Sequence, residues 1–168
     1  MLATMIAGVL IRDLKALHRE IEGYGDERGL WALPTGVTNS AGNLAMHLTG
    51  NLRAFIGAQL GGTGYVRNRD AEFNKRDVPR TELLREVDEA LAAVEHTMAK
   101  LSDADLAKPF PMPIGGATVT SGDFLIHLAT HLTYHLGQID YHRRVVTGET
   151  GAIAAVMPTE ISSARKNA

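Results

Sequence analysis

Hydrophobic residues recur with helical spacing in four segments of the chain, and no segment shows a sustained strand alternation. In the first segment the apolar residues follow one another at steps of three or four: Ile6, Leu10, Leu14, Leu17 and Ile21. The charged residues between them fall outside this stripe, namely Arg12, Asp13, Lys15, Arg19 and Glu20. The first segment therefore predicts an amphipathic helix that ends before Gly23. The third segment, residues 80–101, predicts another helix of the same kind.

The second and fourth segments have a helical period but are almost free of charge. Residues 40–60 contain a single charged residue, and residues 124–139 contain none. Surface helices normally carry charges in every turn, so both segments are expected to be covered on most sides. The start of the fourth helix is also marked, because Thr120 and Asp123 have the spacing of a capping box.

Three connectors, each approaching twenty residues, separate these helices. The second connector (residues 61–79) and the third (residues 102–121) are rich in glycine, proline and charge. Loops of this length within a small domain are often functional, and they free consecutive helices from the simple hairpin order. We expect one all-α domain over residues 1–148, with Gly148 ending the last helix, and an irregular tail over residues 149–168.

The composition is that of an ordinary folded protein, with 168 residues, 45% hydrophobic and 21% charged. Its net charge of −2, from 17 basic and 19 acidic residues, gives no reason to expect a nucleic acid or an anionic membrane as partner. The absence of cysteine excludes disulfides, thiolate metal ligands and a cysteine nucleophile. The apolar N-terminal run lacks a basic flank, and no stretch reaches the about eighteen apolar residues that a membrane span needs. We therefore expect a cytoplasmic protein.

Histidine is the residue type whose placement points to chemistry. The chain has seven histidines, of which His127, His131 and His135 recur every four residues. This spacing stacks their side chains along one helical face, roughly 5–6 Å apart at Cβ, and Gln138 and His142 share that face. Two imidazoles at positions i and i+4 of one helix can reach the same metal ion.

A further histidine, His47, lies in the other uncharged helix, with Asn43 and Asn51 one turn away on either side. A neutral imidazole binds zinc, nickel, copper or ferrous iron, and three imidazoles leave a fourth position for water or substrate. That layout is typical of catalytic rather than structural zinc. Asn43, Asn51 and Gln138 are uncharged groups that can orient the ligand rings by hydrogen bonding from the second coordination shell.

Other interpretations of these residues stay open. The histidine row lies opposite the apolar stripe of its helix, so a histidine-rich face in contact with solvent would give a similar pattern. His18 and His96 are isolated, and we expect them at the surface or at the edge of the core. The second connector is expected to be a solvated loop or a subunit contact, with an anion-binding clamp over the site as the alternative. It carries a cluster of charged residues: Arg67, Arg69, Asp70, Glu72 and Lys75.

Three stretches of the chain resemble the DinB-like family of metalloenzymes. The signature of the family's last helix resembles the stretch HLATHLTYHLGQI. The second helix of one branch of the family resembles SAGNLAMHLTGNLRAFI, and a recurring element of the same branch resembles RNRDAEF. The resemblance covers the chain from about Asn39 to Arg144. It implies a four-helix bundle whose metal ligands are His47, His131 and His135. His127 and His142 fall outside the family's ligand positions.

The family resemblance also implies a range of functions. Characterised relatives include isomerases and transferases that use a low-molecular-weight thiol such as mycothiol or bacillithiol, whereas this branch consists of domains of unknown function. We expect the bound metal to be a divalent ion, with zinc or nickel preferred over iron. We also expect a small-molecule substrate and a homodimer. A metal-dependent hydrolase is possible, and a non-catalytic metal- or ligand-binding bundle that acts through its dimer surface is the alternative. A di-iron oxidase is disfavoured because the chain contains no Glu-x-x-His pair.

Overall fold

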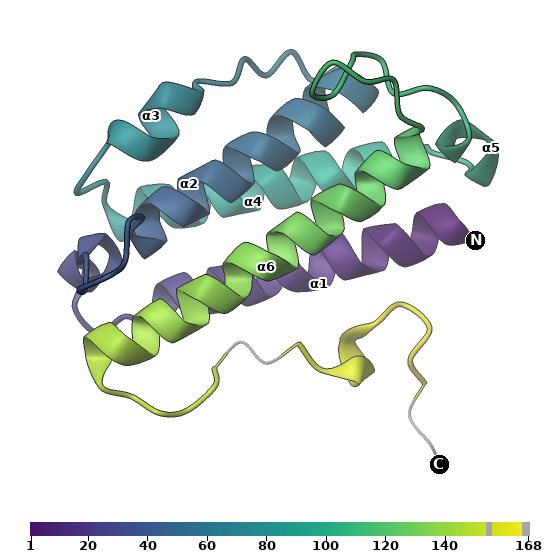
Figure 1. The fold of residues 1–168 in the computed structure, drawn as a ribbon. Coiled ribbons are helices and arrows are strands. Elements are labelled where there is room, and N and C mark those ends of the chain that lie inside the picture. The colour runs from purple at the N-terminus through teal and green to yellow at the C-terminus, as the bar shows by residue number, and fades with distance from the viewer. Residues whose placement is uncertain (154–155, 166–168) are drawn as a thin grey trace.

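Four long helices carry the fold in the computed structural model, which describes residues 1–153 and 156–165 (Figure 1). They are α1 (Leu2–Glu22), α2 (Ala41–Leu52), α4 (Arg80–Met98) and α6 (Ser121–Thr147). Shorter elements lie between and after them: η1 (Glu27–Trp31), α3 (Arg69–Asn74), α5 (Asp103–Leu106) and η3 (Pro158–Glu160). The described residues form no strand, only two isolated bridges. The predicted all-α fold is therefore confirmed.

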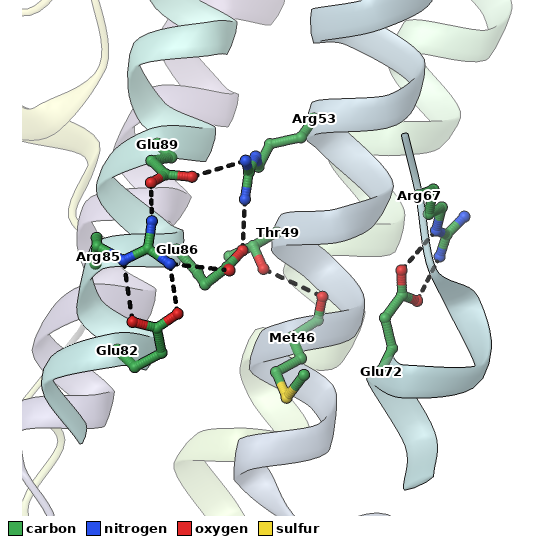
Figure 2. A network of polar contacts seen from close by, with 9 residues as sticks. All are labelled: Met46, Thr49, Arg53, Arg67, Glu72, Glu82, Arg85, Glu86 and Glu89. Atoms are coloured by element: carbon green, nitrogen blue, oxygen red, sulfur yellow. Dashed lines mark hydrogen bonds and ion pairs between the residues drawn. The ribbon is translucent and has the colours of Figure 1, made fainter. Parts of the chain in front are cut away.

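The second predicted helix is present, but its last two turns have a different form. Ser40 caps α2 by accepting the N–H of Asn43, and η2 (Arg53–Leu60) continues α2 as a π-helix. Arg53, at the change from one form to the other, pairs with Glu86 and Glu89 of α4 at 2.5 and 2.7 Å. Figure 2 shows this network beside α2. These ion pairs fix the wider turns of η2 against α4.

The four helices pack with α1 and α2 each contacting both α4 and α6. In Figure 1, α2 and α4 run in one direction, and α1 and α6 run in the other. The connector between α2 and α4 makes this order possible, because it returns along the outside of α2, where α3 packs. The sequence-based expectation that long connectors release the helices from hairpin order is confirmed.

The apolar stripe of α1 is fully buried, as predicted, but two of its charged residues are buried as well. Asp13 and Glu20 were expected outside the stripe, yet each is at most 1% exposed. Since α6 packs along that side of α1, both carboxylates find partners there: Thr133 donates its hydroxyl to Asp13 at 2.5 Å, and Arg143 donates to Glu20 at 2.6 Å. A buried carboxylate of this kind is tolerated because it is hydrogen-bonded.

The uncharged helices differ in how well they are covered. Every residue of α2 except Met46 is buried, as expected. By contrast, α6 presents one continuous exposed face to solvent, so the expectation that it is covered on most sides is wrong. Six exposed residues follow one another along the middle of this face: Ile126, Thr130, Tyr134, Gly137, Tyr141 and Val145. We call these six residues the α6 stripe. Packing against α1 and α2 uses other sides of the helix and leaves the stripe free.

The ends of α6 follow the sequence signals. Thr120 accepts the N–H of Asp123 at 3.1 Å, which is one half of the capping box, and Gly148 ends the helix in the left-handed conformation at φ +74°. In the predicted tail, residues 149–153 and 156–165 are irregular apart from η3, and residues 154–155 and 166–168 lie outside the described residues. Arg19 of α1 pairs with Glu160 of η3 at 3.4 Å. None of the described helices has the length and apolar content required to cross a membrane.

Candidate metal centre

Three histidines from two neighbouring helices converge at one point of the bundle. His47 comes from α2, and His131 and His135 come from adjacent turns of α6. One nitrogen of each ring lies within 4.8 Å of the other two, and the Nε2 atoms of His47 and His131 are 3.3 Å apart. Within the part of the chain that the structure describes, no aspartate or glutamate joins this cluster of candidate ligands. The structure therefore brings together the three residues that the family resemblance implies as ligands.

His47 is held from behind by a buried carboxylate. Its Nδ1 lies 3.1 Å from Oε2 of Glu72, which is 4% exposed and comes from the short helix α3. Arg67 binds the same carboxylate through two nitrogens, each at 2.7 Å (Figure 2). Burial alone raises the pKa of Glu72, but the hydrogen bonds from Arg67 and His47 outweigh it, and the pKa is lowered. An ionised Glu72 accepts the Nδ1 proton of His47 and leaves Nε2 turned toward His131.

His135 is oriented in the same way by Gln138. Its Nδ1 lies 2.6 Å from Oε1 of Gln138, one turn further along α6. The amide oxygen accepts the Nδ1 proton, which leaves the lone pair of His135 on Nε2. Gln138 thus touches a candidate ligand directly, as the sequence-based reading anticipates.

Among the described residues, neither Asn43 nor Asn51 forms a hydrogen bond with a ring of the cluster. Asn43 donates to the backbone oxygens of Glu72 and Lys75 at 2.8 and 3.1 Å, so it fixes α3 over the site. Asn51 is 9% exposed, and its Oδ1 has no hydrogen-bond partner in the described part of the chain. Asn43 therefore helps to place α3, and with it Glu72, beside His47.

Burial also keeps the two α6 histidines neutral. Desolvation lowers the pKa of His131 to about 4, and the neighbouring rings of His135 and His47 lower it further in the same direction. Desolvation likewise lowers the pKa of His135, against the opposing effect of the hydrogen bond to Gln138. A neutral imidazole has one free lone pair, which is what a metal ion requires.

The remaining histidines have other roles. His127 is exposed, stacks between Phe124 and His131, and lies outside the nitrogen cluster. His142 is buried and has both nitrogens occupied: Nδ1 is 2.7 Å from the Tyr24 hydroxyl, and Nε2 is 2.9 Å from the Ala32 oxygen. It therefore ties α6 to the first connector. His18 is partly buried and His96 exposed, both away from the site, as expected.

The sequence predicted the second connector over the site only as an alternative, and it did not reveal the contact of Glu72 with His47. Arg69, Asp70 and Lys75 are exposed, as a solvated loop predicts, but Arg67 and Glu72 face the histidines. The guanidinium Nη2 of Arg67 lies only 3.2 Å from Nδ1 of His47. The available signal was the RNRDAEF element, within which Asn68 caps α3 and turns Glu72 and Phe73 inward.

Comparison with protein families finds a match over most of the chain. A model of the DinB superfamily matches residues 10–139, which run from the middle of α1 into the second half of α6. The matched range contains all three converging histidines together with Arg67, Glu72 and Gln138. No curated protein sequence and no solved structure matches the chain. Since the family model covers most of the chain, the protein belongs to the DinB superfamily.

Proposed function

We propose that the protein binds a divalent metal ion through His47, His131 and His135 and is a metal-dependent enzyme. The observation that carries this proposal is the convergence of three imidazole nitrogens within 4.8 Å from two helices. The outer nitrogens of His47 and His135 are held by Glu72 and Gln138, as in the outer shells of known metal sites. Nitrogen donors of this kind suit zinc or nickel, and also ferrous iron.

Three protein ligands leave a coordination position open, which is the arrangement of catalytic rather than structural sites. A bound divalent ion supplies Lewis acidity there and lowers the pKa of a water or thiol. The charges around the site set its preference. An imidazole binds a metal ion in its neutral form, and Arg67 and Glu72 neutralise each other at 2.7 Å, so the positive charge of the ion is left for an anionic group to balance.

The reaction class that we propose is transfer or isomerisation with an external low-molecular-weight thiol. A thiol ionises readily and then satisfies the charge demand of the site. The chain has no cysteine of its own, so the thiol has to come from outside. Nη1 of Arg67 forms no hydrogen bond within the described residues, which leaves it available to a carboxylate of such a thiol or of the substrate.

A second candidate function is a non-catalytic metal- or ligand-binding bundle that acts as a homodimer. The α6 stripe favours it, because this face is uncharged and contains large exposed side chains. Tyr134, Tyr141 and Val145 are each at least 65% exposed. Two copies of the stripe packed against each other would remove these side chains from water.

Metal content tests the ligands. Protein purified without nickel resin is expected to hold one equivalent of zinc or nickel by elemental analysis. His47→Ala, His131→Ala and His135→Ala should each abolish stoichiometric binding. His127→Ala is the matched control, since it removes an imidazole from the same helical face, one turn before His131, outside the cluster. Equal loss in the control would mean that the histidine row is only a diffuse chelator.

Cobalt-substituted protein separates the functional classes. With a small thiol such as 2-mercaptoethanol, we expect a sulfur-to-metal charge-transfer band that requires all three histidines. A spectrum that does not change when a thiol is added, but changes with pH near neutrality, would favour a hydrolase. A spectrum that responds to neither would contradict the enzyme proposal and favour the non-catalytic bundle.

A further inference from the structure

The first connector meets the second half of α6 at one end of the bundle (Figure 1). A cavity lined by residues of both segments and by Leu44 of α2 lies beside the histidine cluster, since Gln138 belongs to its lining and contacts His135. Its volume is about 320 Å³, within the roughly 300–1,000 Å³ usual for small-molecule sites. Apolar walls come from three elements: Pro34 and Val37 of the connector, Leu44 of α2, and Tyr141 and Val145 of α6. The cavity is therefore concave and mainly apolar, as ligand pockets are.

The lining of this cavity carries no formal charge. It contains no Asp, Glu, Lys or Arg among the described residues. Its one titratable imidazole, His142, has both nitrogens engaged by Tyr24 and Ala32, and burial lowers its pKa. A charged ligand group would lose hydration here without gaining a side chain of opposite charge. The lining therefore selects against charged ligands and favours uncharged, largely apolar ones.

A few polar groups remain free to orient such a ligand. The side chains of Thr38 and Asn39 and the amide nitrogen of Gln138 form no hydrogen bond within residues 1–153 and 156–165. Apolar walls with a few convergent polar groups are the usual composition of a specific small-molecule site. The same lining thus offers both the area for binding and the means of recognition.

Gln138 connects the cavity to the candidate metal centre. Its Oε1 accepts from Nδ1 of His135 at 2.6 Å, while the residue also lines the cavity. Leu44 lies on α2 one turn before His47, so the wall formed by α2 leads from the cavity to a second candidate ligand. Gln138 on α6 and Leu44 on α2 therefore both line the cavity and both lie within one turn of a candidate ligand.

We propose that this cavity binds the uncharged, largely apolar part of the substrate, with the amide of Gln138 between that part and the metal centre. The proposal rests on the proposed function, because it makes the cavity a subsite of the same centre. A ligand hydrogen-bonded to the free amide nitrogen of Gln138 would shift the amide whose oxygen holds His135. Occupancy of the cavity and the environment of the metal are therefore coupled.

The test uses N-phenyl-1-naphthylamine, an uncharged aromatic fluorophore whose emission rises in apolar surroundings. It should bind the full-length protein with a stoichiometry near one. Val145→Trp fills the cavity from α6 and Val37→Trp from the connector; both residues are partly exposed, so the core is not disturbed. Each should weaken binding at least tenfold. Ile126→Trp is the matched control, because it lies on the α6 stripe outside the cavity.

The cobalt form then tests the link to the metal. The fluorophore should change the visible cobalt spectrum of the wild-type protein and of Ile126→Trp, but not of the two filled variants. Binding that is absent, or equally weak in the control, would overturn the cavity as a ligand site. Binding that leaves the cobalt spectrum unchanged would overturn its role as a substrate subsite. Fluorophore binding to a protein that takes up no metal would refute the proposed function while the cavity still stands as an apolar site.

Discussion

The carboxylate of Glu72 offers the sharpest test of how the histidine cluster is built. Glu72→Gln preserves the shape and volume of the side chain but removes its charge. In the structure this carboxylate accepts from Nδ1 of His47 at 3.1 Å and from two nitrogens of Arg67. The neutral amide would hold His47 less firmly and would leave the charge of Arg67 unbalanced, 3.2 Å from the His47 ring.

Both consequences weaken the binding of a cation at His47. Loss of an outer-shell partner typically costs about 10–100-fold in metal affinity, which corresponds to roughly 1.4–2.7 kcal/mol. We therefore expect zinc affinity to fall by about that factor, while one equivalent still binds at saturation. The measurement is a zinc titration in competition with a chromogenic chelator, with the thermal unfolding of the metal-free protein recorded alongside.

Glu86→Gln provides the matched control for this experiment. Glu86 is also paired with an arginine, Arg53 at 2.5 Å, but on the side of α2 that faces α4 (Figure 2). Its substitution should leave zinc affinity within about twofold of the wild-type value, a change of roughly 0.4 kcal/mol. The reasoning is refuted if Glu72→Gln also stays within twofold, or if the control loses as much affinity as Glu72→Gln.

Three further predictions concern the bundle around the site. Arg143→Met leaves Glu20 buried without its partner and should lower the free energy of unfolding by about 3–5 kcal/mol in urea titrations. Burial lowers the pKa of His142, so the unfolded state binds a proton at this residue at higher pH than the folded state does. The free energy of unfolding should therefore fall as the pH drops below about 6.5. In the metal-free protein, His142→Gln should lose less of this free energy between about pH 7 and pH 5. Tyr134→Lys places a charge on the α6 stripe and should shift a homodimer toward monomer in light scattering, and an unchanged mass would refute the stripe as the interface.

The sequence reveals the two histidines of α6 more directly than the third. His131 and His135 share one helix, so their i, i+4 spacing alone places them side by side. The approach of His47 depends on how α2 packs against α6, which no local pattern encodes. The family resemblance supplied that pairing, because it reports the packing of a whole fold rather than the period of one helix.

For the same reason, the hydrophobic pattern of the sequence could not predict the long-range polar contacts. A periodic reading puts Glu20 outside the stripe of α1, but its partner Arg143 comes 123 positions later along the chain. The contact of Glu72 with His47 depends on a short helix within a long connector, where no hydrophobic period exists to be read. The lack of charge on α6 was ambiguous too, since an uncharged helical face can be buried or can remain exposed, as the α6 stripe does.

The groups at the site come from helices and from connectors, and this suggests a separate role for each kind of segment. The nitrogen donors stand on α2 and α6, whose spacing is fixed by buried core residues such as Leu48 and Leu132. Glu72, Arg67 and half of the residues that line the cavity come instead from the two connectors, which the core constrains much less. Metal binding should therefore depend on the helices, and substrate selection on the connectors. An exchange of residues 34–39 should accordingly change the ligands that the cavity accepts while leaving zinc stoichiometry at one, and a loss of zinc from such a variant would contradict this division.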